Sequence, residues 1–192
     1  SRLSPDLALA EAQRLAVLGV GGVLLFGIPD AKDPEGSGAA DPNGPVAETL
    51  RKLRDAALPL VSVADVCLCE YTDHGHCGVL KGEAVDNDAT LYLLADVAVA
   101  YAEAGADLVA PSAMMDGQVA ALRSALASAG HQATAIMAYA STQAAGFYGP
   151  FREAAGSTPR FGDRKACQLD PAKGRDAPPE QDTQSEEGNE RP

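Results

Sequence analysis

The stretch ADLVAPSAMMDGQVAALRSALASAGHQATAIMAYA, residues 106–140, decides the fold class of this 192-residue chain. Two apolar runs, 107–111 and 133–140, flank a segment, 116–129, in which apolar residues recur at helical spacing. Runs this apolar have no side suited to water, so we expect strands that are buried on both faces. A strand, a helix and a second such strand form a right-handed βαβ unit with parallel strands.

The same alternation extends toward the N-terminus. Helices are expected over 5–18, 45–57 and 89–104, and buried strands over 20–28 and 59–66. Four strands alternating with four helices predict an α/β fold, either a doubly wound sheet or part of a TIM (β/α)8 barrel. No G-x-G-x-x-G follows the first strand, and polar residues follow several strands, which favours roughly four βα units of a barrel.

Composition narrows the class of partner. The net charge of -12 argues against nucleic acid and against an anionic membrane surface, because both would repel the chain, and so favours small molecules or proteins. No apolar run approaches the roughly 20 residues that span a bilayer, and the first residues lack the order of a signal peptide. A cytoplasmic location is therefore expected.

The chain divides into one domain and a tail. Residues 1–171 carry the barrel pattern, whereas residues 172–192 are polar and contain no Val, Ile, Leu or aromatic residue. Such a composition cannot bury enough apolar surface to fold, so we predict a disordered tail.

The segment DVCLCEYTDHGHCG, residues 65–78, gathers most of the soft metal ligands of the chain. Cys67 and Cys69 point the same way if the strand continues through them, and the loop that follows is long enough to return Cys77 to the same point. Three thiolates suit zinc with an open fourth position, although a cluster of reduced, partly buried thiols is the alternative. His74 and His76 are weaker candidates, since loop histidines commonly hydrogen-bond nearby.

These residues also resemble a known family. DVCLCEYTDHGHCGVL (65–80) is similar to the metal-binding segment of porphobilinogen synthase, or delta-aminolevulinic acid dehydratase. Three further segments follow the same family in the same order: LLFGIPDAKDPEGSGAADPNGPV (24–46), AGADLVAPSAMMDGQV (104–119) and FYGPFREAAGSTPRFGDRKACQLDP (147–171). The resemblance implies a TIM barrel that condenses two molecules of 5-aminolevulinate into porphobilinogen, on the pathway to haem.

The resemblance also implies roles for individual residues. Cys67, Cys69 and Cys77 match the zinc ligands, and a magnesium site is implied in a later part of the family sequence. The positions that match substrate-binding or catalytic ones are Arg152, Arg164, Tyr148, Gln168, Asp65 and Ser112. Without the family, the two arginines would more readily be read as surface residues. Asp65 and Ser112 could equally be caps of the next turn or helix. Homo-oligomers of the octamer type are implied as well.

Two of the departures from the family pattern bear directly on the imine chemistry. Family members form Schiff bases through two lysines, and Thr142 stands at the position of the first. The Val-Lys-Pro segment of the second is absent from these 192 residues. A hydroxyl cannot form an imine, so we expect this chain to be inactive by itself. The alternative is a non-catalytic zinc-binding relative that assembles with a complete subunit.

Overall fold

The computed structural model describes residues 2–139, 142, 148–160 and 168. The tail predicted over 172–192 lies outside the described residues. Among the described residues no helix is both long and apolar enough to cross a membrane.

Helices and strands alternate along the chain as predicted. The helices are α1 (Pro5–Val17), α2 (Pro45–Ala56), α3 (Asn87–Ala104), α4 (Gln118–Ser128) and α5 (Tyr148–Ala155), with a short 3-10 helix, η1 (Ser37–Ala40). The strands are β1 (Gly22–Leu25), β2 (Val61–Val66), β3 (Leu80–Lys81), β4 (Ala84–Val85), β5 (Leu108–Pro111) and β6 (Ala135–Ile136). Helix α1 begins where the sequence predicts, because the Ser4 side chain accepts a hydrogen bond from the Leu7 amide.

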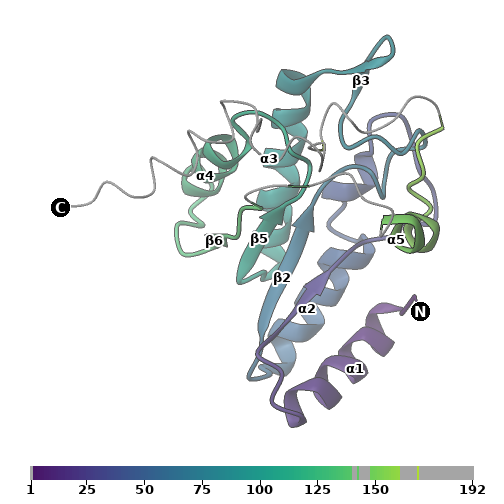
Figure 1. Ribbon diagram of the computed structural model, residues 1–192. Coiled ribbons are helices and arrows are strands. Elements are labelled where there is room, and N and C mark those ends of the chain that lie inside the picture. Colours follow the sequence, from purple (N-terminus) through teal and green to yellow (C-terminus); the bar gives the residue numbers. More distant parts are fainter. Residues whose placement is uncertain (1, 140–141, 143–147, 161–167, 169–192) are drawn as a thin grey trace.

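Four of these strands form one parallel sheet in the order β1-β2-β5-β6. Each strand is the neighbour of the next strand of this sheet in sequence, and the intervening helices α2, α3 and α4 lie on one side of it (Figure 1). The predicted α/β class with parallel strands is confirmed. All four strands end at the same edge, so residues that follow them are brought together.

The core lies between this sheet and its helices. The most fully buried side chains come from α2, α3, α4 and the helix-facing side of β2 and β5: Leu50, Val66, Leu94, Tyr101, Val109, Leu122 and Leu126. Alternation in a strand sends successive side chains to opposite faces, so the same strands also present a second face away from the helices.

The prediction of strands buried on both faces is confirmed for β2 after Val61 and for β5 after Leu108, but it is wrong for β1 and β6. Leu24, Phe26, Val61 and Met137 remain between 38% and 42% exposed. Leu24 is paired with Val63 in the sheet register, on the side opposite the helix-facing Ala64 and Val66. In the described part of the chain, the four strands of this sheet do not close into a barrel.

One predicted strand is shorter than expected, and two further elements were not predicted. The strand expected over 133–140 is ordered as a strand only at Ala135–Ile136. The short antiparallel hairpin of β3 and β4 was not predicted, because each strand has only two residues and leaves no period to detect. Helix α5 was also missed, since Gly149 and Pro150 in its first turn are usually signals of a loop.

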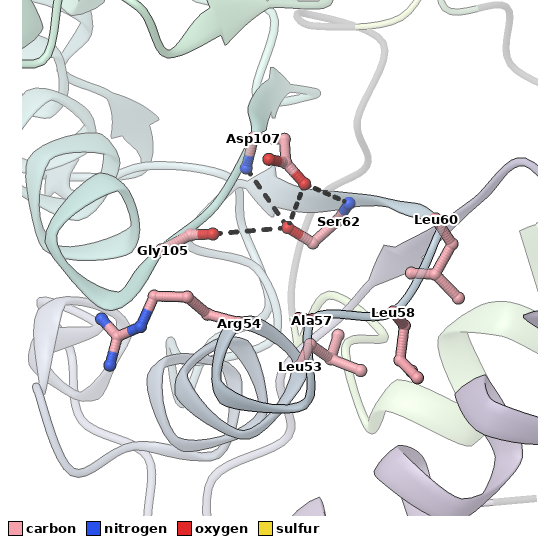
Figure 2. Close-up of a pocket in the computed structure, with 8 residues that line it drawn as sticks. All are labelled: Leu53, Arg54, Ala57, Leu58, Leu60, Ser62, Gly105 and Asp107. Carbon is pink, nitrogen blue, oxygen red and sulfur yellow. Dashed lines mark hydrogen bonds between the residues drawn. The ribbon is translucent and has the colours of Figure 1, made fainter.

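A pocket of about 200 Å³ lies at the opposite edge of the sheet, where β2 and β5 begin (Figure 2). The Ser62 amide and hydroxyl both donate to Asp107 Oδ2 at 2.8 Å, and the Asp107 amide donates to Ser62 Oγ at 3.2 Å. These bonds join the starts of two neighbouring strands, so the edge serves stability.

Replacing Ser62 with alanine tests that role. The Ser62→Ala variant loses the hydroxyl in both directions, so we expect the free energy of unfolding to fall by about 1–2 kcal/mol. Urea denaturation of the purified chain measures this. Ser128→Ala, at the exposed end of α4, is the matched control; equal stability of the two variants would contradict the assignment.

Candidate metal and substrate site

The candidate site lies at the carboxyl edge of the sheet, where β2 and β5 end side by side. Val66 is the register partner of Pro111, and the Ser112 amide donates to the Val66 carbonyl at 3.2 Å. Asp65, the cysteine loop (residues 67–77) and Ser112 therefore meet at one place. Sequence order alone separates Asp65 and Ser112 widely, and the parallel pairing brings them together.

The three cysteines of this loop are all buried, and their sulfur atoms lie within 4.8 Å of one another. The Sγ atoms of Cys67 and Cys69 are 3.4 Å apart, and the Cys69 amide donates to Cys67 Sγ at 3.5 Å. Sulfur atoms around a tetrahedral zinc ion are about 3.8 Å apart, so the arrangement fits a metal ion of that size. The strand ends at Val66, so a turn brings Cys67 and Cys69 together, whereas the sequence interpretation assumed an extended chain.

The surroundings of Cys67 and Cys69 raise the pKa of both thiols and so favour their neutral form. The hydrogen bond with Cys67 raises the pKa of Cys69, and burial adds to this effect. For Cys67, the hydrogen bond with Cys69 lowers the pKa, but the contact with Cys77 and burial outweigh it, so that this pKa is also raised. Thiolates here need a nearby cation, and a metal ion that displaces the protons would supply it.

The His74 side chain has another role in this structure, and neither histidine of the loop joins the cysteine group. Nδ1 of His74 accepts from the His76 amide at 3.1 Å, so Nε2 carries the proton and donates to the Pro34 carbonyl at 3.0 Å. Both ring nitrogens of His74 are thus engaged. Among the described residues, the group able to share one metal ion consists of the cysteines, and neither histidine belongs to it.

Two carboxylates sit beside the cysteines. Asp65 is buried, and its pKa is raised by burial and by the nearby Glu70, an effect that a hydrogen bond with Ser112 partly offsets. Its Oδ1 atom is buried without a hydrogen-bond partner among the described residues. A buried, unpaired oxygen of this kind is a polar group available to a ligand or water. Glu70 is also buried, and the sequence interpretation overlooked it.

Three of the predicted substrate-binding residues lie together on and after α5. The Arg152 guanidinium is 5.5 Å from the centre of the Tyr148 ring, and its Nη2 donates to Gln168 Oε1 at 3.3 Å. Arg152 Nε is buried without a hydrogen-bond partner in the described part of the chain. Arginine binds carboxylates through pairs of such donors, so this group is suited to an anionic ligand.

Helix α5 packs against the same edge of the sheet. Phe151 contacts Phe26, just after β1, with ring centres 5.1 Å apart, and Figure 1 shows α5 beside the end of β1. After the helix, the Arg160 amide donates to the His74 carbonyl at 3.1 Å. The substrate-binding candidates are thereby held next to the cysteine loop.

The pKa of Tyr139, just beyond β6, depends on groups from both the cysteine side of the site and helix α5. Its pKa is raised by burial and then by the charges of Asp65, Tyr148 and Cys67. Thr142 is partly buried, and among the described residues no hydrogen bond to it is found. The predicted Arg164 lies outside the described residues.

The shape of the cysteine loop depends on Tyr71, which the sequence interpretation also overlooked. The Tyr71 hydroxyl is 3.1 Å from the buried Tyr101 hydroxyl of α3, and it lies against the Cα atom of Gly27. A Cβ atom at Gly27 would collide with that hydroxyl. A glycine directly after a strand can indicate that another group approaches the backbone closely, but the sequence does not identify that group.

Comparison with known proteins identifies the relatives of this chain. The family model described as delta-aminolevulinic acid dehydratase matches residues 1–191. Proteins named delta-aminolevulinic acid dehydratase are 53% identical over 171 residues in Methanothermobacter thermautotrophicus and 48% identical over 186 residues in Bacillus subtilis. These matches cover 89% and 97% of this chain but only 52% and 57% of the relatives, so the chain spans about half their length.

A solved structure gives the same result for the fold. The delta-aminolevulinic acid dehydratase (porphobilinogen synthase) of Toxoplasma gondii, in complex with the reaction product porphobilinogen, superposes with a TM-score of 0.88 at 36% identity. The match covers 97% of this chain and 55% of that one. The predicted barrel class is therefore confirmed, with this chain forming part of such a barrel.

The contact between Gly27 and Tyr71 yields a prediction. In Gly27→Ala the new methyl group must displace Tyr71 and break its hydrogen bond to Tyr101, so we expect a loss of about 2–4 kcal/mol in the free energy of unfolding. Gly21→Ala is the control, because a Cβ there meets nothing within 4 Å. Denaturation curves compare the two, and a Gly27→Ala variant as stable as the control would refute the packing argument.

Proposed function

Because the chain belongs to the delta-aminolevulinic acid dehydratase family, we propose that it supplies the zinc-binding and carboxylate-binding part of a porphobilinogen synthase site. The reaction is the condensation of two molecules of 5-aminolevulinate to porphobilinogen. The observation that carries the proposal is the cluster of three buried cysteine sulfurs within 4.8 Å, at the edge of the sheet where barrel enzymes place their sites.

Zinc is the ion that the donors favour. Thiolates are soft ligands, and three of them with no histidine in the group leave a fourth tetrahedral position for a substrate oxygen or water. A zinc ion held there would act as a Lewis acid toward that oxygen. Asp65 lies at the same edge of the sheet, and its Oδ1 has no hydrogen-bond partner among the described residues. Its carboxyl group would hold a proton or accept one from the ligand.

The substrate carboxylate would bind at α5. Arg152 offers a buried Nε and a charge that Tyr148 and Gln168 hold in place. We propose Arg164 as the second arginine, on the resemblance alone. An anionic substrate suits these cations although the chain as a whole carries a net charge of -12, because binding depends on the local field.

Thr142 separates this chain from the rest of the proposed chemistry. An imine with a substrate ketone requires an amine, and a threonine hydroxyl cannot provide one. The second candidate is therefore a non-catalytic zinc-binding relative that assembles with a complete subunit. Retention of all three cysteines beside a changed lysine position favours it. Under either proposal we expect reduced thiols in a cytoplasmic location, and homo-oligomers as in the family.

The zinc assignment leads to a prediction. The reduced chain, dialysed against zinc, should retain about one ion per chain, and the variant with serine at positions 67, 69 and 77 should retain none. Elemental analysis with a protein assay measures the ratio. His74→Ala is the matched control, because the His74 nitrogens bond to the protein and the variant should keep its zinc. Equal zinc in the triple variant and the parent would refute the site.

The imine chemistry gives a separate prediction. Borohydride added with 5-aminolevulinate should trap no substrate on residue 142 of the parent chain, whereas Thr142→Lys should gain a trapped adduct that mass spectrometry locates at that residue. Gln132→Lys, on an exposed turn, controls for nonspecific labelling. An adduct at position 132 as abundant as that at 142 would show that the position has no special reactivity.

A further inference from the structure

Helix α5 has only eight residues, too few to be stable by local hydrogen bonding alone. The carbonyls at the C-terminal end of any helix lack partners within that helix and need them from elsewhere. In α5 the first of these partners are backbone amides: Gly156 N donates to the Glu153 carbonyl and Ser157 N donates to the Arg152 carbonyl.

The next three carbonyls are bound by cations from remote parts of the chain. Arg2 Nε donates to the Ala154 carbonyl at 2.8 Å. Lys32 Nζ donates to the carbonyls of Ala155 at 3.1 Å and Gly156 at 2.9 Å. Positive charge at a helix C-terminus is favourable, because the last carbonyls carry partial negative charge. The end of α5 is therefore completed by tertiary contacts, of which Lys32 makes two.

Lys32 also belongs to the layer that holds the cysteine loop. The next residue, Asp33, forms a parallel bridge with Thr72, and its carbonyl accepts from the Asp73 amide at 3.0 Å. Pro34 accepts the His74 hydrogen bond. Burial lowers the pKa of Lys32, and the charges of Glu70 and Cys69 partly offset this effect. Lys32 thus joins three segments: its own loop, the cysteine loop and α5.

From these contacts we infer that Lys32 is a positioning residue for Arg152: it fixes the C-terminal end of α5 against the cysteine loop and so holds the substrate-binding arginine beside the metal site. This inference rests on the proposed function for the role of Arg152. The effect of Lys32 on α5 itself stands on the hydrogen bonds alone. Lys32 is not among the residues that would hold the metal ion.

The test compares Lys32→Met, which keeps the apolar stem, with Lys32→Arg, which keeps the charge and the donors. Hydrogen exchange of the zinc-loaded chain should show the α5 amides exchanging about tenfold faster in Lys32→Met, and at nearly the parent rate in Lys32→Arg. Lys81→Met, on the exposed β3 strand, is the matched control. Exchange in α5 of Lys32→Met no faster than in the control overturns the inference.

Ligand binding provides the second measurement. Calorimetry with 5-aminolevulinate should show affinity weakened about tenfold in Lys32→Met and restored in Lys32→Arg, while the zinc content is unchanged. A loss of zinc or of global stability equal to the loss of affinity would show a general structural role and overturn the inference. If the parent chain binds no 5-aminolevulinate, the proposed function fails for this chain, and the exchange measurement still decides whether Lys32 fixes α5.

Discussion

The parallel pairing of β2 with β5 is the constraint on which the rest of the structure depends. Its register sets Val66 opposite Pro111, so Asp65, the cysteine loop and Ser112 leave the sheet at one edge. The same pairing is fastened at its other end by Ser62 and Asp107. One end of these two strands therefore serves stability and the other presents the polar chemistry, the division of labour typical of βα barrels.

The candidate site is built from layers that depend on one another. Tyr71, packed against Gly27 and bonded to Tyr101, supports the turn that gathers the sulfurs. Helix α5 packs on Phe26, just after β1, through Phe151, and the segment after the helix contacts the cysteine loop through the Arg160 amide and the His74 carbonyl. The candidate metal ligands and the candidate substrate-binding arginine consequently belong to separate segments that are held in place by a few specific contacts.

Hydrogen bonds among the thiols, together with burial, explain much of the electrostatics of this site. The pKa is raised for the thiols of Cys67 and Cys69 and for the carboxyl of Asp65. All three groups therefore favour their neutral forms. A divalent cation bound here would stabilise the thiolates, which these surroundings otherwise disfavour. The polar groups of this edge thus suit a metal site better than they suit an ordinary protein core.

The order of helices and strands, the parallel sheet and the three cysteines that follow one strand can all be predicted from the amino-acid sequence. Those features follow from apolar periodicity and from spacing, which are local properties. Three features are seen only in the folded structure. A turn brings Cys67 next to Cys69, both ring nitrogens of His74 form hydrogen bonds, and residues 148–155 form helix α5. Lys32 shows the reason: its partners lie more than 120 residues away, and no local pattern records a contact made across that distance.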